Sequence, residues 1–587
     1  MELSPSQVIV LATPVFLLLI AVELAWGVLR KRNTYRLNDA INSLSLGMLS
    51  QISAVLTRLF RIGVYTAVFS SLALWRNDDF WLSPAGWLLA LVFYDFCYYW
   101  LHRAGHEVGV FWAAHVVHHQ SQDYNLTTAL RQTSSGALLG WVFYVPMALA
   151  GVPPLVFGVV ALIDLLYQFW VHTEHVGKLG WFDRWFCSPS NHRVHHAVND
   201  GYLDRNYGGV LVIWDRMFGS FQEEGEKCVY GTRSPLNSWD PLWSNAEVYW
   251  ALARDSWRAR AWTDKVRVWF KPPGWRPADV AQRFPREPFS IDRVQRYHPP
   301  ISRGLAWFTL VEFTIILGGV ALFLWHADQM PLSQSGVWLA ALTAALWALG
   351  RAIQGRFTVL EVLLVQAAAL ATATAAQGWI EPHRVFKPLA LLLAITLVAL
   401  RADLMRDPRR FGPKLLAALL LCLAGDVFLM FPGYFIPGLV SFLAGHLCFI
   451  AVFKQGVRWF PSRGALAATL AAAGVMYAIL FPHLGPVLKV AVAAYAVVIA
   501  LMAAQAIGRA YALRDMLAAG VAVGSVLFML SDALLAINRF ATPLPLAQFW
   551  VLATYYAAQI LIVRNSRPPG VADAVTARTA HPPAAAA

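Results

Sequence analysis

The sequence predicts an all-α polytopic membrane protein made of two successive multi-span units. The 587 residues are 58% hydrophobic and only 14% charged, with a mean hydropathy of +0.50, which is far from the composition of water-soluble domains. Apolar runs that approach the roughly 20 residues of a spanning helix recur along the chain. Histidines gather beside the first of these runs, so we expect the first unit to hold metal.

The first apolar runs are expected to bring the chain repeatedly to one membrane face. Residues 8–29 precede a basic cluster (Arg30, Lys31, Arg32 and Arg36) without a cleavage site, which predicts a retained anchor with its basic flank in the cytoplasm. Residues 41–74 should hold one span or a re-entrant pair, and residues 86–101 another span. Residues 137–170 should form a two-span hairpin around Gly151-Val-Pro-Pro154. The hairpin would return the chain to the face at which residue 102 emerges.

Residues 177–303 are polar, basic and rich in tryptophan. Beside membrane spans this composition is typical of an interfacial cap that contacts anionic headgroups. We therefore expect a cytoplasmic cap, a membrane partner and no nucleic acid, and the net charge of +13 fits this interpretation.

Ten apolar runs with short connections follow a Pro-containing linker at residues 297–300. We interpret residues 301–354 as linker and connecting spans, residues 355–563 as a second multi-span domain, and residues 564–587 as a disordered tail rich in Pro, Ala and Thr. The five cysteines are widely spaced without a Cys-x-x-Cys pair, so neither disulfides nor a thiolate metal site is predicted.

Ten of the sixteen histidines fall between residues 102 and 196. They are His102, His106, His115, His118, His119, His172, His175, His192, His195 and His196. On a helix, residues three or four apart share one face at about 5–6 Å, so three of the groups present a stripe of imidazoles that could each hold a metal. A single histidine is explained equally well as a hydrogen-bonded core residue. For the whole set, burial without partners would cost about 1–3 kcal/mol per ring, which favours ligands.

The number and type of these donors predict two metal ions. Imidazole suits zinc, copper, iron and nickel, and eight or more nitrogens exceed the four that one tetrahedral structural zinc takes. Two imidazole-rich ions at a membrane surface favour iron used for oxygen activation, while the spacing also leaves a di-zinc site open.

Five segments around the histidines resemble a known family: residues 95–107, 123–132, 168–174, 192–196 and 205–219. Over about residues 5–300 the chain resembles the alkylglycerol monooxygenases of the fatty acid hydroxylase superfamily, membrane di-iron enzymes that hydroxylate the ether-linked carbon of glycerol ether lipids. The resemblance implies a helical di-iron hydroxylase domain over residues 1–300 that uses two Fe ions, O2 and tetrahydrobiopterin. The reductant must be external, because the chain has no GxGxxG fingerprint and no iron–sulfur cysteine pattern.

The resemblance also assigns roles to residues. It implies that the histidines named above are the iron ligands, except that His175 is a candidate through its spacing from His172 alone. Glu107 and Glu174 are interpreted as carboxylates that orient ligand rings, as outer-shell partners usually do.

Two acids, Asp426 and Asp532, interrupt apolar runs of the second half. A charge at the bilayer centre costs at least about 2.5 kcal/mol, so both are functional candidates, although an acid that caps a helix near the interface would look the same. Residues 386–389, 425–430, 442–446, 531–532 and 555–559 resemble the lysoplasmalogenase (YhhN-like) family, over about residues 355–563. Those enzymes hydrolyse vinyl ether bonds of lysolipids. The resemblance implies an acid/base pair of Asp426 and Asp532, with Lys387 and His446 as polar neighbours.

Together the two resemblances predict a multi-pass membrane enzyme that cleaves both alkyl and alkenyl ether glycerolipids, with its histidine site on the cytoplasmic side. A sterol or fatty acid hydroxylase or desaturase remains an alternative, because the histidines define oxygen activation and not the substrate. A metal or lipid transporter is a second alternative. Against transport, the histidines are expected at one surface and not staggered through the bilayer. The sequence leaves the oligomeric state open.

Overall fold

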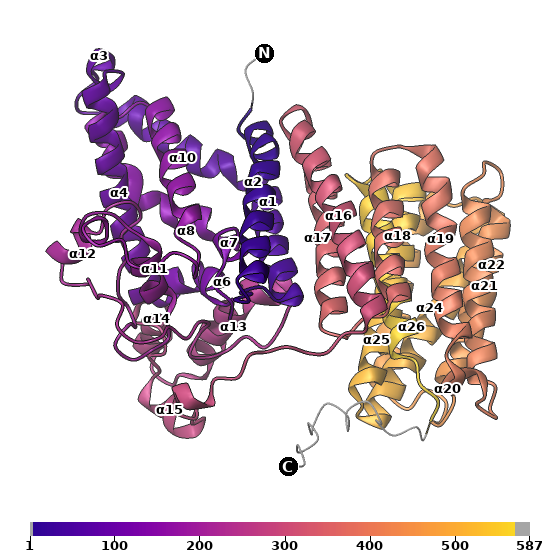
Figure 1. Cartoon of the computed structure of the whole chain (residues 1–587). Helices are drawn as coiled ribbons and strands as arrows, with labels where there is room; N and C mark the ends of the chain where they lie inside the picture. Colours follow the sequence, from indigo (N-terminus) through magenta and orange to yellow (C-terminus); the bar gives the residue numbers. More distant parts are fainter. Residues whose placement is uncertain (1–3, 570–587) are drawn as a thin grey trace, which may run out of the picture. The chain divides into compact units, whose positions relative to one another are not determined.

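The computed structural model describes residues 4–569, which fold into helices joined by loops, with two isolated β-bridges (Figure 1). The chain divides into two compact units, unit 1 up to Arg356 and unit 2 from Phe357. Within the described range, eleven helices are long and apolar enough to cross a membrane. These helices confirm the predicted all-α multi-pass fold. Of the predicted disordered tail, residues 564 and 565 end the last helix, and residues 570–587 lie outside the described residues.

Four long helices form the part of unit 1 that surrounds its histidines. They are α1 (Pro5–Leu29), α2 (Leu37–Leu72), α4 (Pro84–Glu107) and α10 (Pro154–Trp170). α1 begins at a capping box, in which the Ser4 hydroxyl accepts from the Gln7 amide and the Gln7 side chain accepts from the Ser4 amide. α16 (Arg303–His326) and α17 (Leu332–Ile353) contact α1 and α2. The segment interpreted as linker and connecting spans thus belongs to unit 1.

The predicted hairpin turn lies between α9 (Val145–Ala150) and α10. The apolar helices on its two sides, Gly136–Ala150 and Pro154–Trp170, are shorter than a spanning helix, and neither they nor α4, which holds the span predicted at residues 86–101, are among the eleven candidates. Gly151 caps α9 in the left-handed conformation, with φ of +91°, and a Cβ atom there would collide with the carbonyl oxygen of Trp75. Pro154 then starts α10 at the first helical position, where the missing N–H has no cost. The turn therefore requires the glycine and accommodates the proline, the two residues that predicted it.

The polar part of unit 1 contains α5 (Gly109–Ala113), α6 (Val116–His119), α7 (Leu126–Ala129), α11 (Pro189–His196), α12 (Ile213–Met217), α13 (Pro241–Arg258), α14 (Trp262–Phe270) and α15 (Ala278–Arg283). Two further short helices of this unit, α3 (Asp78–Trp81) and α8 (Gly136–Gly140), precede α4 and α9. Figure 1 shows α13, α14 and α15 at the end of unit 1 where α6 and α11 also lie. Trp257 and Trp262 are 86% and 81% exposed there, as a surface that contacts lipid headgroups would require.

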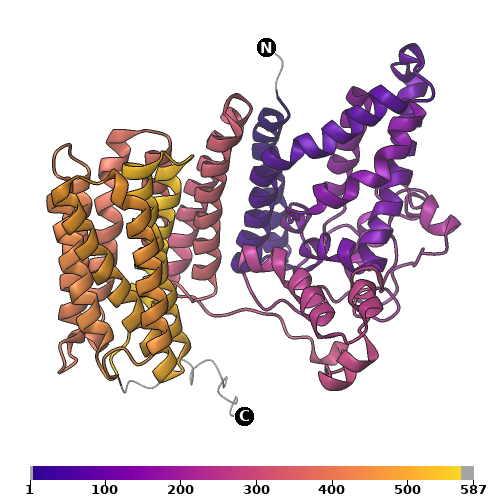
Figure 2. The same ribbon diagram turned by 180° about the vertical axis from the view of Figure 1, so that it is seen from behind.

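Unit 2 is a bundle of eight long helices, seen from behind in Figure 2. They are α18 (Val359–Ala376), α19 (Ile380–Ala399), α21 (Phe411–Leu429), α22 (Phe435–Phe453), α23 (Arg463–Leu480), α24 (Pro486–Leu513), α25 (Met516–Ala536) and α26 (Ala547–Asn565), with the short α20 (Ala402–Met405) between two of them. With α16 and α17 they account for all ten predicted apolar runs. At the α21–α22 crossing, a Cβ atom on Gly425 would lie 2.6 Å from the Phe442 ring, so a glycine lets the two helices approach beside Asp426.

Candidate active sites

Nine of the ten histidines predicted as ligands converge in two groups. The first histidine cluster consists of His102, His106, His115, His119 and His195, and the second of His118, His172, His192 and His196. Within each cluster, one potential ligand atom per residue lies within 4.8 Å of all the others. Eight of the nine rings belong to buried residues, and His115 is half-buried.

The two clusters draw on the same short helices. α6 supplies His119 to the first cluster and the adjacent His118 to the second, and α11 divides His195 and His196 in the same way. Neighbouring residues diverge because successive side chains on a helix are about 100° apart at 3.6 residues per turn. The expectation that each stripe holds its own ion therefore does not describe this arrangement.

Backbone carbonyl oxygens fix the orientation of four cluster rings through Nδ1. The pairs are His102 with Tyr207 at 2.7 Å, His118 with Arg131 at 3.0 Å, His172 with Gln168 at 2.8 Å, and His195 with Arg205 at 3.0 Å. A carbonyl oxygen only accepts hydrogen bonds, so Nδ1 must carry the proton in each ring. Their Nε2 atoms are then unprotonated acceptors that are available to a metal.

These acceptors face one another at distances that suit a shared cation. The Nε2 atoms of His118 and His172 lie 3.1 Å apart, although neither carries a proton that could join them. Two nitrogens that bind one ion at about 2.1 Å and at right angles lie about 3.0 Å apart. Other Nε2 pairs in the clusters lie 3.0–3.2 Å apart. The Nε2 atoms of His106 and His195 are buried and lack a hydrogen-bond partner in the described part of the chain. The residues thus fit two metal ions.

Burial keeps these rings neutral. It lowers the pKa of His118 to about 4, and it also lowers the pKa values of seven other cluster histidines well below the usual range: His102, His115, His119, His172, His192, His195 and His196. A metal binds the neutral imidazole. These eight rings are therefore in the neutral form that binds a metal at neutral pH.

The two glutamates predicted to orient ligand rings lie elsewhere. Glu107 accepts hydrogen bonds from Arg103 Nε at 3.0 Å and from the Tyr207 hydroxyl at 3.4 Å. Glu174 lies near Tyr230, and the pKa of the Tyr230 hydroxyl is raised first by burial and then by the charge of Glu174. In the described residues neither glutamate accepts a hydrogen bond from a cluster histidine. A carboxylate that does approach one is Asp204, with Oδ1 3.7 Å from His106 Nδ1.

Two acids that the sequence analysis did not select hold the loop that contains Tyr207, whose carbonyl orients His102. Asp215 accepts hydrogen bonds from the amides of Tyr207 and Gly208 at 2.7 and 2.8 Å. Asp95 accepts from two further amides of this loop and from an indole, at 2.7–3.1 Å. Asp95 interrupts an apolar run as Asp426 does, so the criterion that found Asp426 would have found it.

Arg131 supports the second cluster in a similar way. It is fully buried, and its guanidinium donates to the Val117 carbonyl at 2.6 Å and to the Asn42 side chain at 2.7 Å. Its own carbonyl accepts from His118. In the sequence, Arg131 belongs to residues 123–132, one of the five segments that resemble the alkylglycerol monooxygenases, but the sequence analysis assigned no role to it.

His175 lies outside both clusters. Its Nε2 is close to α1, where a Cβ atom on Gly27 would lie 3.2 Å from it. We expect His175→Ala to keep the metal content of the wild type and His172→Ala to lower it, because only His172 belongs to a cluster whose nitrogens could bind one ion together. Elemental analysis of both purified variants measures this. Equal metal loss in the two variants would instead support the ligand role predicted from spacing.

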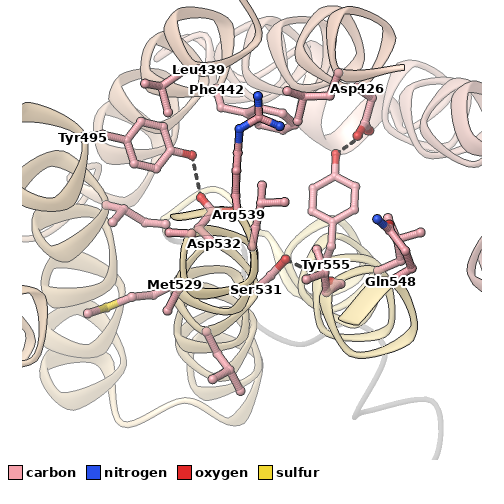
Figure 3. Close-up of a pocket in the computed structure, with 18 of the residues that line it drawn as sticks. Asp426, Leu439, Phe442, Tyr495, Met529, Ser531, Asp532, Arg539, Gln548 and Tyr555 are labelled. Carbon is pink, nitrogen blue, oxygen red and sulfur yellow. Dashed lines mark hydrogen bonds between the residues drawn. The ribbon is translucent and has the colours of Figure 1, made fainter. Parts of the chain in front are cut away.

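Unit 2 contains a cavity of about 880 Å³ that both predicted acids line (Figure 3). Asp426, which is 2% exposed, pairs with Lys387 Nζ at 3.3 Å and accepts from the Tyr555 hydroxyl at 2.7 Å. Asp532 accepts from the Tyr495 hydroxyl at 2.5 Å. His446 Nε2 lies 2.9 Å from that hydroxyl and 3.5 Å from Asp532 Oδ2.

The two carboxylates thus occupy different surroundings in one cavity. Asp426 is held by a cation and a phenol, whereas Asp532 is held by a phenol that an imidazole also contacts. Such a difference is what acid/base pairs require, because one group must give a proton while the other takes one. The sequence pointed to Lys387 and His446, but it gave no reason to select Tyr495.

Comparison with known proteins agrees with this division. Residues 87–220, which include both histidine clusters, match the fatty acid hydroxylase family, and residues 383–566, which include both acids, match the YhhN family. Alkylglycerol monooxygenase from Homo sapiens is 38% identical over 309 residues, which is 52% of this chain and 68% of the relative. The chain belongs to the alkylglycerol monooxygenase family. The Danio rerio alkylglycerol monooxygenase is 37% identical over 372 residues, which is 60% of this chain and 79% of the relative.

This member of the alkylglycerol monooxygenase family also contains a lysoplasmalogenase-related part. Lysoplasmalogenase TMEM86B from Homo sapiens is 31% identical over 191 residues, which is 32% of this chain and 79% of the relative. No solved structure matches the chain. The alkylglycerol monooxygenase and lysoplasmalogenase resemblances predicted from motifs are therefore both confirmed.

Proposed function

We propose that unit 1 is a di-iron monooxygenase that hydroxylates the ether-linked carbon of a glycerol ether lipid. The product is a hemiacetal, which separates into a fatty aldehyde and a glycerol derivative. The observation that carries this proposal is the pair of imidazole clusters whose unprotonated nitrogens face one another, in a chain of the alkylglycerol monooxygenase family. Imidazole donors suit iron.

In this proposal the nine cluster histidines hold two Fe ions, and iron supplies the activation of O2. The protein's own contribution is to keep eight of the rings neutral through burial, which lowers their pKa values, and to fix four rings through backbone carbonyls. Electrons come from tetrahydrobiopterin, an external reductant. In this proposal Glu107 and Glu174 keep their predicted role of orienting ligand rings. Glu107 does so through Tyr207, because it accepts from the Tyr207 hydroxyl and the Tyr207 carbonyl holds His102.

We further propose that unit 2 hydrolyses the vinyl ether bond of lysolipids. One carboxyl of the Asp426 and Asp532 pair protonates the carbon of the enol ether, and the other directs water to the cation that forms. The resulting hemiacetal also separates into an aldehyde and a glycerol derivative. One chain would thereby remove both alkyl and alkenyl groups from ether glycerolipids in the membrane.

The clusters are proposed to face the cytoplasm. The basic segment after α1 lies at the same end of unit 1 as the clusters, because Arg36 Nε contacts Asp123 Oδ2 at 2.8 Å, four residues after His119. Basic flanks favour the cytoplasmic side. Labelling of a cysteine introduced at exposed Asp204 in sealed cells tests this: protection from a membrane-impermeant reagent supports the orientation, and labelling contradicts it.

The proposals are tested with the full chain purified in a maltoside detergent. We expect two irons per chain, and aldehyde release from an alkylglycerol that requires both O2 and tetrahydrobiopterin. Aldehyde release from an alkenyl lysolipid should require neither. If the protein binds iron but releases no aldehyde from the alkylglycerol, the substrate of unit 1 would instead be a sterol or a fatty acyl group. A protein that binds no iron would contradict the oxygenase proposal.

A further inference from the structure

Four consecutive residues, which we call the orienting segment (residues 204–207), reach three of the five histidines of the first cluster. Each contact joins one residue of the segment to one ring: the Arg205 carbonyl to His195 Nδ1 at 3.0 Å, the Tyr207 carbonyl to His102 Nδ1 at 2.7 Å, and Asp204 Oδ1 to His106 Nδ1 at 3.7 Å. The three histidines belong to two helices, α4 and α11. One short stretch of loop therefore orients rings that two separate helices bring together.

The backbone of the orienting segment has two residues in the left-handed region. Asp204 and Asn206 have φ of +56° and +55°, values that residues other than glycine rarely adopt and that aspartate and asparagine tolerate best. Such residues persist only where their surroundings hold them, and they are frequent at functional sites. Asn206 is 2% exposed, so the contacts that hold it are internal.

The Asn206 side chain supplies these contacts. Its Nδ2 donates to the Asn191 carbonyl at 2.9 Å and to the Gln222 carbonyl at 2.8 Å, and its Oδ1 accepts from the Gln222 amide at 2.8 Å. The Asn206 amide donates to the Ser220 carbonyl at 3.0 Å. Asn191 belongs to α11, which carries three cluster histidines. Asn206 thus ties the orienting segment directly to that helix.

Asn206 also lies between the two carbonyls that hold rings. The Arg205 carbonyl precedes the φ torsion of Asn206, and the Tyr207 carbonyl follows its ψ torsion. A change in either torsion of Asn206 would therefore turn the two carbonyls relative to each other. The hydrogen bonds of the Asn206 side chain oppose such a change, because they fix this residue to main-chain groups on both sides of the segment.

We propose that Asn206 is a positioning residue of the first histidine cluster, which fixes the rings of His102 and His195 for a metal through the carbonyls of the residues on either side of it. Asn206 itself contacts neither ring. The inference rests on the metal binding proposed for unit 1, and it gives a role to a residue of the family-like segment 205–219. A ring whose Nδ1 proton is held presents its Nε2 in one direction.

The affinity of the full chain for metal tests the inference. It is measured without O2 or reductant, by competition with a chromophoric chelator, for Fe²⁺ and in parallel for Zn²⁺. We expect Asn206→Ala to lower both affinities by about 10–100-fold, as loss of a group that holds metal ligands typically does. Asn206→Gly removes the same hydrogen bonds but keeps the left-handed backbone accessible, so it should also lose affinity, to a smaller extent.

Asn237→Ala is the matched control. Asn237 is another asparagine of unit 1 with a left-handed backbone, at φ of +47°, but it is exposed and lies outside the orienting segment. Its replacement should leave both affinities at the wild-type value. The thermal stability of each metal-free variant is measured on the same preparations, because a purely structural asparagine would change that stability and leave the metal affinity of the folded protein unaltered.

An unchanged metal affinity in either folded Asn206 variant overturns the inference, and so does an equal loss of affinity in Asn237→Ala. Failure of the proposed oxygenase has a different signature. A wild type that binds Zn²⁺ but not Fe²⁺ contradicts the oxygenase, while the comparison of Zn²⁺ affinities still decides the role of Asn206. A wild type that binds Fe²⁺ and releases no aldehyde from an alkylglycerol likewise leaves that comparison decisive, because affinity is measured without turnover.

Discussion

His118→Ala is expected to lower the iron content to one ion per chain or less and to abolish pterin-dependent aldehyde release from an alkylglycerol. His118 is one of four donors of the second cluster, and its Nε2 faces that of His172 at 3.1 Å. Loss of a residue that only hydrogen-bonds a metal ligand typically costs about 10–100-fold in metal affinity or activity. Loss of a ligand itself should therefore reduce the rate of aldehyde release below a hundredth of that of the wild type. Elemental analysis and an aldehyde assay on the same preparation measure both effects.

His298→Ala provides the control for this experiment. His298 is exposed, belongs to unit 1 and lies outside both clusters, so both iron content and aldehyde release should match the wild type. If His118→Ala retained two irons and full activity, the second cluster would not be a metal site. If both variants lost iron, the loss would reflect general instability of unit 1, and the assignment of His118 would lack support.

Asp426→Asn and Asp532→Asn are each expected to reduce vinyl ether hydrolysis by about 10²–10⁴-fold, the usual contribution of a positioned acid or base. Asparagine keeps the size of the side chain and can still accept from Tyr555 or Tyr495, so the cavity should persist. Iron content and alkylglycerol cleavage should remain at wild-type levels, because both acids belong to unit 2. Aldehyde release from an alkenyl lysolipid, measured without O2 and pterin, reports the change.

Asp403→Asn is the matched control for the two acids. Asp403 forms a partly exposed ion pair with Arg401 at 2.8 Å in unit 2 and does not line the cavity, and such pairs contribute little to stability. Hydrolysis should therefore be unchanged. Should Asp426→Asn or Asp532→Asn keep more than about a tenth of the wild-type rate, that carboxylate would have a structural role such as helix capping, and the acid/base assignment would fail.

Much of this architecture could be predicted from sequence because it is encoded locally. The length of the apolar runs predicted the long helices, and Gly151 with Pro154 predicted the turn between α9 and α10. Nine histidines were found because their spacing is regular on helices and because they lie beside apolar runs. The same contrast between a charge and an apolar run identified Asp426 and Asp532.

The remainder depends on tertiary packing that a linear pattern does not contain. The rings of His102 and His118 are oriented by carbonyls of Tyr207 and Arg131, and main-chain atoms are common to all residues. The sequence therefore assigned this role to side chains, Glu107 and Glu174. Likewise, the partnership of Tyr495 with Asp532 arises only when α24 packs on α25.

Because α6 and α11 each contribute histidines to both clusters, two ions bound there would not bind independently of each other. An ion in the first cluster would immobilise His119 and His195, and the neighbouring His118 and His196 would then already be in place for a second ion. Such coupling is reciprocal. When iron is scarce, individual molecules should therefore divide into fully metallated and empty forms, with few that carry a single ion.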